Sequence, residues 1–149
     1  MRAFPDLPPV WWLGSIAAIY LFKFIAPGLH PDIWWLDALS WLVLLAALAI
    51  IVWSAWYFFA RKTTIEPHHT PKVLIEEGPF QWSRNPIYLA LVMLTLSFAM
   101  GNGSLLGLVL TAVLWLVLDR RFAAPEEALL RQTFGQEADA YCTRVRRWI

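Results

Sequence analysis

The sequence predicts an all-α protein, a polytopic integral membrane helical bundle of about four spans with a cytosolic helical cap at its carboxyl end. Of its 149 residues, 59% are hydrophobic and only 15% are charged, whereas about a quarter of the residues in a typical soluble domain are charged. The apolar residues gather in long blocks, as membrane-spanning helices require. The ten tryptophans fit aromatic belts at the membrane interfaces. We expect a single domain, residues 1–149.

The first two apolar blocks, residues 10–26 and 34–60, predict the first two spans. The first is interrupted by Lys23 near its end, where a lysine can extend its ammonium group to the interface. A secretory signal peptide is the competing interpretation. Because the flank at Pro27 and Gly28 offers no good small-residue cleavage site and more apolar blocks follow, we favour a span.

The last two apolar blocks, residues 86–101 and 104–120, are joined by a short Gly- and Asn-containing turn. Each is shorter than the roughly 20 residues that a normal span needs. Two interpretations therefore compete: a tight pair of spans extended by their flanks, which we prefer, or a re-entrant hairpin. Ser104 is expected to cap the fourth helix.

The tail, residues 121–149, predicts two helices on the cytosolic side. Pro125 suits a first helical turn, Glu126 and Glu127 suit the positive end of a helix dipole, and Gly135 can terminate that helix. An amphipathic interfacial helix is expected to follow. Its apolar face would carry Ala138, Tyr141, Val145 and Trp148, with Arg144, Arg146 and Arg147 on other faces directed to lipid headgroups.

The basic residues predict the orientation. With four spans, the amino terminus, the loop 61–85 and the tail share one side. Together with Arg120 at the end of the fourth block, they carry every one of the 12 basic residues except Lys23. Because cytosolic segments of membrane proteins are enriched in Lys and Arg, both termini and the loop are expected to be cytosolic, at the cell inner membrane if the protein is bacterial. The net charge of +1 gives no sign of a nucleic-acid partner.

The densest polar cluster of the first 118 residues runs from Gly78 to Tyr88, at the expected mouth of the third span. Gly78 and Pro79 mark a turn. Asn85 and Pro86 are typical of a helix start, with Asn as the cap and Pro at the first position. The same stretch holds two aromatic residues, a cation and a phenol, which are Phe80, Trp82, Arg84 and Tyr88. A surface loop without a function needs none of them.

This cluster resembles the core motif of the isoprenylcysteine carboxyl methyltransferase and phospholipid methyltransferase superfamily. The similar segment runs from Lys72 to Tyr88, and the tail segment Pro125–Gly135, followed by Tyr141, is similar to the family's Glu-Glu, Phe-Gly and Tyr module. The chain has Asn85 where the family usually has His, and Phe80 where it often has Tyr. The resemblance implies a membrane methyltransferase that uses S-adenosylmethionine, bound at the cytosolic end of the bundle.

The residues themselves can meet the needs of that cofactor. The apolar run 73–75 and Phe80 can hold adenine. The backbone amides at the start of the third span and Arg84 can receive the cofactor's carboxylate. The side chain of Glu126 or Glu127 can meet its ammonium group or its ribose. An electron-rich ring, from Tyr88, Phe80 or Trp82, can face the sulfonium. The expected cofactor contacts are Lys72, Val73, Leu74, Ile75, Gly78, Phe80, Arg84, Asn85, Pro86, Ile87, Tyr88, Glu126 and Glu127.

In methyl transfer the cofactor supplies the reactive group, and the protein mainly aligns the reactants and excludes water. We expect Arg84, Tyr88 and His69 to be the catalytic residues. A carboxylate acceptor needs no general base, whereas an amine does, and His68 or His69 is then the candidate. The expected acceptor is a lipid or a lipidated small molecule or protein, and no metal is expected. The alternatives are a non-catalytic four-span interaction protein and an NADPH-dependent membrane reductase.

Overall fold

The computed structural model describes residues 6–31, 33–61 and 73–149, and within these ranges every regular element is helical. The elements are α1 (Pro8–Ile25), η1 (Pro27–Leu29), α2 (Trp34–Ala60), η2 (Gly78–Gln81), α3 (Pro86–Gly101), α4 (Leu105–Leu118), the π-helical turn η3 (Asp119–Ala123), α5 (Ala124–Phe134) and α6 (Gln136–Arg144). The all-helical prediction is confirmed for the described part of the chain.

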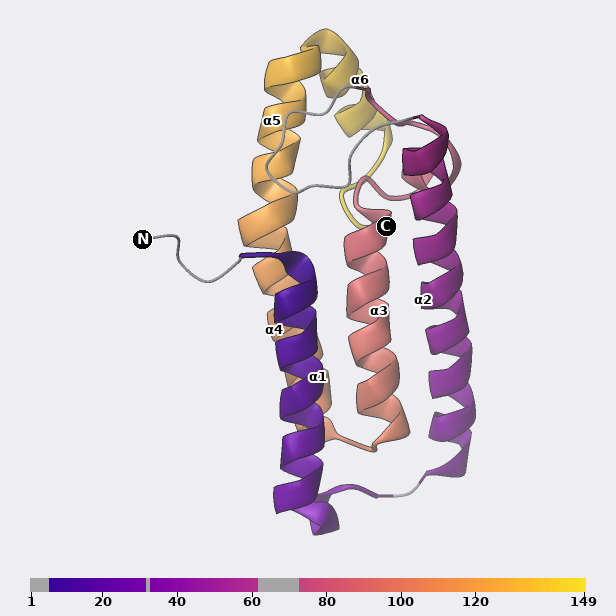
Figure 1. Ribbon diagram of the computed structural model, residues 1–149, viewed down its shortest axis with the longest axis vertical. Helices are drawn as coiled ribbons and strands as arrows, with labels where there is room; N and C mark the ends of the chain where they lie inside the picture. The colour runs from indigo at the N-terminus through magenta and orange to yellow at the C-terminus, as the bar shows by residue number, and fades with distance from the viewer. Residues whose placement is uncertain (1–5, 32, 62–72) are drawn as a thin grey trace.

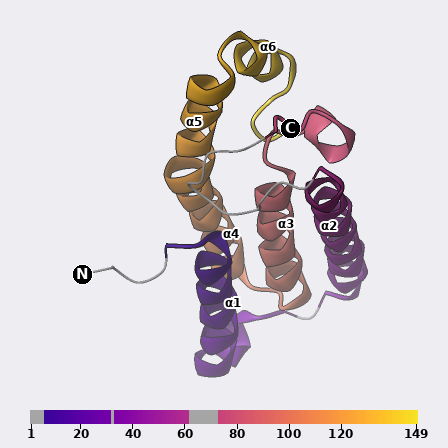
Figure 2. The same cartoon turned by 45° about the horizontal axis from the view of Figure 1, so that its top comes forward.

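Helices α1, α2, α3 and α4 run up and down beside one another (Figure 1). The α1–α2 connection and the α3–α4 turn lie at one end of the bundle, and α5, α6 and the carboxyl terminus lie at the other, as the tilted view of Figure 2 also shows. Helix α3 packs against α1, α2 and α4. It is therefore the central helix, and half of its 16 residues are buried.

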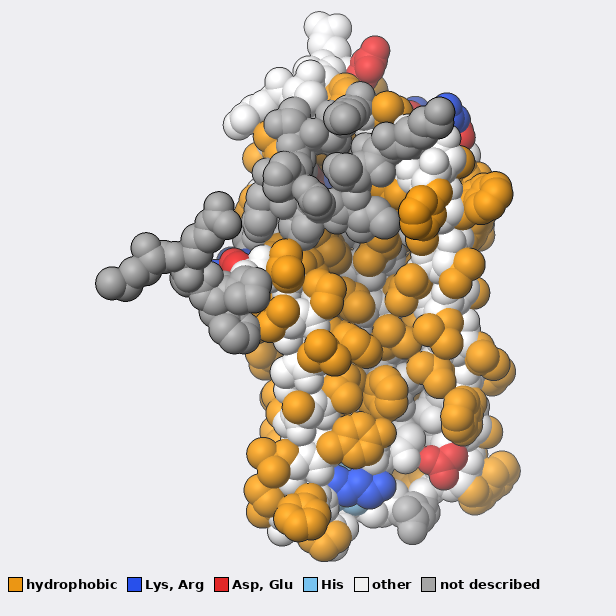
Figure 3. Space-filling view, viewed as in Figure 1, with side chains coloured by type: hydrophobic (Ala, Val, Ile, Leu, Met, Phe, Trp, Pro, Cys, Tyr) orange, Lys and Arg blue, Asp and Glu red, His pale blue; other side chains and the backbone are white. Residues whose placement is uncertain are grey.

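Helices α1 and α2 expose most of their apolar surface. They are long and apolar enough to cross a membrane, yet only 11% and 17% of their most apolar windows are buried. Figure 3 shows hydrophobic side chains covering this face along the length of the bundle, with charged groups near its ends. The core helix of a soluble protein would be mostly buried, so this surface indicates contact with lipid.

Small residues allow the helices to approach closely. The buried residues of α2 are Ser40, Ala47 and Ser54, spaced seven apart, and a Cβ added at Gly101 of α3 would lie 3.0 Å from Ser40 Oγ. A Cβ added at Gly107 of α4 would lie 2.7 Å from the Cβ of Ala99. Such small-residue contacts are how helices associate where lipid removes the hydrophobic drive.

Helices α4 and α5 form one rod joined by the π-helical turn η3, rather than the separate helix expected to begin at Pro125. In this turn the amide of Ala124 bonds five residues back to Asp119. Pro125 follows directly, and it has no amide hydrogen for the regular helical pattern. Glu126 and Glu127 consequently do not lie at a free helix end. Ser104 caps α4 as predicted, accepting from the Gly107 amide at 3.0 Å.

The tail departs from the expected amphipathic helix. Ala138, Tyr141 and Val145 are buried as expected, but α6 ends at Arg144 and the last residues run back to the start of α3. There the Arg84 amide donates to the carbonyl of Arg146 at 3.0 Å. This return is what brings the carboxyl terminus into the site described next.

Candidate functional site

Tyr88, which is buried, and Glu126, which is partly buried, form the centre of the site. Tyr88 lies in the first turn of α3, and its hydroxyl donates to Glu126 Oε1 of α5 at 2.6 Å. The Tyr88 ring is buried and lies 6.2 Å from the ring of Phe122 in the π-helical turn. The hydrogen bond therefore joins α3 to α5 through two residues that lie 38 positions apart in the sequence.

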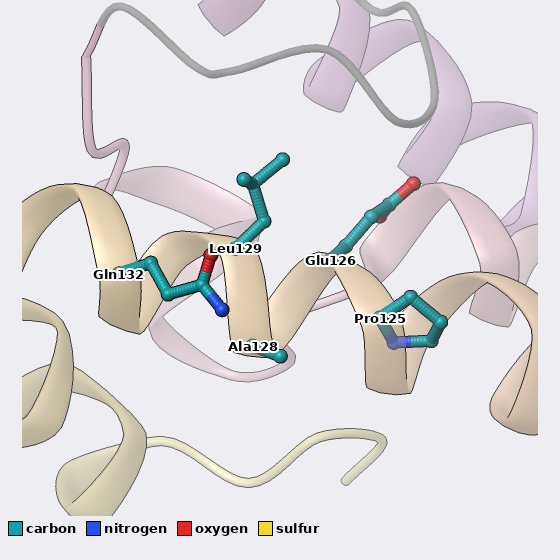
Figure 4. Close-up of a pocket in the computed structure, with 5 residues that line it drawn as sticks. All are labelled: Pro125, Glu126, Ala128, Leu129 and Gln132. Atoms are coloured by element: carbon teal, nitrogen blue, oxygen red, sulfur yellow. The ribbon is translucent and has the colours of Figure 1, made fainter.

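Glu126 sits in an environment that resists its charge. Burial raises the pKa of Glu126, and the hydrogen bond from Tyr88 offsets only part of that effect. Beside it lies a hollow of about 330 Å³, lined by Pro125, Glu126, Ala128, Leu129 and Gln132. Figure 4 shows Glu126 and Leu129 projecting from the same side of α5. A carboxylate and an apolar side chain thus border one space.

Glu127, the next residue, faces a cluster of arginines. Its Oε2 lies 3.1 Å from Arg84 Nη2 and 2.9 Å from Arg147 Nε, and its Oε1 lies 3.2 Å from Arg131 Nη2. Burial acts to raise the pKa of Glu127, but the hydrogen bonds and charges of these arginines outweigh it, so the pKa is lowered. Glu127 is held as a carboxylate.

Arg84 is enclosed by this cluster. Only 10% of its side chain is exposed; Nη1 donates to the Cys142 carbonyl at 3.2 Å, and Nη2 pairs with Glu127. No acceptor among the described residues partners its buried Nε. The structure therefore places the two expected cofactor contacts Arg84 and Glu127 against each other.

Asn85 occupies the cap position of α3 without capping it, contrary to the expectation. Its side-chain amide instead donates to the Arg147 carbonyl at 3.3 Å, and its backbone amide donates to Ser83 Oγ at 3.1 Å. Pro86 begins α3 as predicted, so the Ile87 amide lies in the first helical turn. The Asn85 side chain thus ties α3 to the carboxyl-terminal tail.

Phe80 is packed inside the protein and does not present an exposed ring to a ligand. It is buried, its ring lies 5.6 Å from Phe58, and its carbonyl accepts from the Tyr141 hydroxyl at 2.8 Å. Gly78 has φ of +59°, and a Cβ added there would lie 2.3 Å from the Tyr57 ring, so glycine is required at this turn.

The apolar run differs along its length: Val73 is exposed, Leu74 is partly buried and Ile75 is buried. Trp82 is 70% exposed and packs edge-on against Trp53 of α2, on the outer surface. Two expected residues, His69 and Lys72, lie outside the described residues, as does His68. Among the described residues, no group of His, Cys, Asp and Glu side chains could hold a metal.

Asp119 also belongs to this cluster, although it was not among the residues expected from the sequence. Its Oδ1 accepts from Arg147 Nη1 at 3.1 Å and from Trp148 Nε1 at 2.9 Å, and Trp148 lies 5.9 Å from Trp115. Contrary to expectation, Arg147 is directed inward rather than to headgroups. An acid at the end of an apolar helix needs a partner, which was the available signal, but the partner lies 28 residues away.

A model of the phospholipid methyltransferase family matches residues 35–137. The chain belongs to this family, which confirms the resemblance and implies a membrane methyltransferase. The matched stretch runs from the start of α2 to the start of α6, so it includes Tyr88, Glu126 and Glu127 but not Arg147. No curated protein matches the chain.

Proposed function

We propose that the protein transfers a methyl group from S-adenosylmethionine to a lipid-like or lipidated acceptor at the cytosolic face of the membrane. The acceptor group would be the carboxylate of an isoprenylcysteine-like compound or the amine of a phospholipid. The observation that carries the proposal is the Tyr88–Glu126 pair, which lies beside a hollow at the polar end of an apolar bundle, in a chain of a methyltransferase family.

The residues present fit this cofactor. Ligand pockets measure about 300–1,000 Å³, and the hollow beside Glu126 reaches the lower end of that range. The Glu126 carboxylate can receive the α-ammonium group or the ribose hydroxyls, and the Ile87 and Tyr88 amides can receive the carboxylate. The two terminal nitrogens of Arg84 are engaged by Glu127 and by the Cys142 carbonyl, so they could assist by sharing or leaving those partners. When bound, the cofactor supplies an activated methyl group.

The protein would contribute orientation and a dry site. The hydrogen bond to Glu126 fixes the Tyr88 ring, an electron-rich surface suited to a sulfonium. An amine acceptor would have to lose a proton, and His69 remains our candidate base, whereas a carboxylate acceptor would need none.

The helix lengths support the membrane placement. Trp35 and Trp56 of α2 are both exposed and are separated by about 32 Å of helix, close to the roughly 30 Å thickness of the hydrocarbon core. Four spans would put the Tyr88–Glu126 pair near the cytosolic boundary. The polar cofactor would arrive from water and the acceptor sideways from lipid, so an acceptor with a long apolar chain should react much faster than its head group alone.

The melting temperature of the purified protein in detergent tests the cofactor. A ligand in large excess over its dissociation constant stabilises by a few kcal/mol, so S-adenosylhomocysteine should raise the melting temperature. Stabilisation by NADPH instead would indicate a reductase, and stabilisation by neither would indicate a non-catalytic protein.

A further inference from the structure

The carboxyl-terminal tail places one side chain between two acids. Arg147 Nε and Nη2 each lie 2.9 Å from Glu127 Oε2 of α5, and Nη1 lies 3.1 Å from Asp119 Oδ1 at the end of α4. All three side chains are at least two-thirds buried. A planar guanidinium presents five donors in a fixed fork that suits two carboxylates, whereas an ammonium is a compact point charge without that fixed geometry.

Helix α5 needs such a support. The elements that pack most closely against it are its own chain neighbours, η3 and α6, and none of its eleven residues, all described, is fully buried. It also follows the π-helical turn, where the regular bonding is interrupted. Besides the continuous backbone and the packing on η3 and α6, the side-chain contacts of Glu126 and Glu127 are what hold α5 over α3.

We propose that Arg147 is a positioning residue for the methyl-transfer site. By tying Glu127 to Asp119, it holds α5 at the rotation at which Glu126 reaches Tyr88. Successive residues on a helix point about 100° apart, so fixing Glu127 toward the tail turns Glu126 toward α3. The part of this proposal that concerns catalysis rests on the proposed function, and the part that concerns the position of α5 does not.

The loss of Arg147 would act on alignment more than on ligand capture. Glu126 could still swing to a ligand, but the reacting groups would no longer be held in one geometry. A misplacement of about 1 Å can cost about 100-fold in rate. We therefore expect Arg147→Gln to lower kcat about 10- to 100-fold while the KM for S-adenosylmethionine changes less than about threefold.

The matched control is Arg146→Gln. It removes the same charge from the adjacent residue. The Arg146 side chain is exposed, and its hydrogen bond among the described residues is to the Ile149 carbonyl at 3.5 Å. Arg147→Lys keeps the charge but loses the planar fork that holds both acids in one geometry, so it should resemble Arg147→Gln. Turnover would be measured with phosphatidylethanolamine vesicles and with a farnesylated cysteine derivative, using whichever the parent methylates.

A distance measurement tests the position of α5 without activity. Spin labels at Thr133 of α5 and Phe59 of α2, both exposed, would be placed in a Cys142→Ser background. The distance distribution should broaden with Arg147→Gln and stay narrow with Arg146→Gln. If Arg147→Gln does not fold, Asp119→Asn, which removes the other end of the bridge, takes its place.

A double-mutant cycle tests whether Arg147 acts through Glu126. If Arg147 acts through Glu126, Arg147→Gln should lower kcat no further in a Glu126→Gln background. An unchanged distance distribution, or an equal loss of kcat in both backgrounds, would overturn the proposal. A broadened distribution in a protein that neither binds S-adenosylhomocysteine nor transfers methyl groups would support the positioning of α5 and refute the proposed function.

Discussion

Glu126 and Glu127 are neighbours on α5, yet they belong to two different regions of the molecule. Glu126 faces α3 and a hollow, and Tyr88 is its hydrogen-bond partner. Glu127 faces the tail and is surrounded by three arginines. Burial dominates at Glu126 and cations dominate at Glu127, so the pKa of the first is raised and that of the second is lowered. We infer that the Glu127 side holds the fold together and leaves the Glu126 side for a ligand.

The largest expected effect of breaking this arrangement is on stability, at Glu127. Glu127→Gln removes the charge that neutralises Arg84 and Arg147, and breaking a buried ion pair costs about 3–5 kcal/mol. Because the cluster is partly exposed, we expect a loss of about 2–4 kcal/mol, measured by denaturant unfolding in detergent. The control is Arg131→Gln at the exposed end of the same cluster, which should cost less than about 1 kcal/mol. Similar losses for the two variants would mean that Glu127 is no more than a surface acid.

A smaller loss is expected from Tyr88→Phe on the other side of α5. This change leaves the Glu126 carboxylate without its donor, and an unsatisfied buried group costs about 1–3 kcal/mol. The loss should be measured again in the Glu126→Gln background, where the neutral amide needs the phenol less and the cost should shrink. An equal cost in both backgrounds would show that the hydrogen bond is not what Tyr88 contributes.

The smallest effect is a difference in the pH dependence of stability. Glu126 has a raised pKa, so the folded state holds its proton longer and stability falls as the pH rises above about 4.5, the ordinary value. Glu127 has a lowered pKa, so its stabilising contribution is present above 4.5 and is lost as the pH falls toward its folded pKa.

Each substitution should therefore remove one of these two dependences of the unfolding free energy on pH. The free energy concerned is about 1.4 kcal/mol for each pH unit that separates the folded and unfolded pKa values. The melting temperature of Glu126→Gln should fall less than that of the parent between pH 5 and 7, and Glu127→Gln should fall less between pH 4.5 and 3. If Glu126→Gln flattened the acidic range and Glu127→Gln the range from pH 5 to 7, the environments assigned to the two glutamates would be wrong.

The sequence predicted the helices better than it predicted their contacts. The apolar blocks 34–60 and 86–101 coincide with α2 and α3, because hydrophobic block length is a local signal. The motif residues Tyr88 and Glu126 are brought together, but the resemblance, not the spacing, pointed to them. The direction of Arg147 could not be foreseen, since it depends on a π-helical turn and on a tail that returns to α3.

The measurement that tests the central claim most directly is the affinity of Glu126→Gln and Glu127→Gln for S-adenosylhomocysteine. Isothermal titration of each purified variant, at neutral pH and well below its melting temperature, would give the two dissociation constants beside that of the parent. If Glu126 meets the ligand, its variant should bind at least about tenfold more weakly, a loss of about 1.4 kcal/mol. Glu127→Gln should stay within about threefold of the parent. A weaker affinity in Glu127→Gln with an unchanged one in Glu126→Gln would contradict the account.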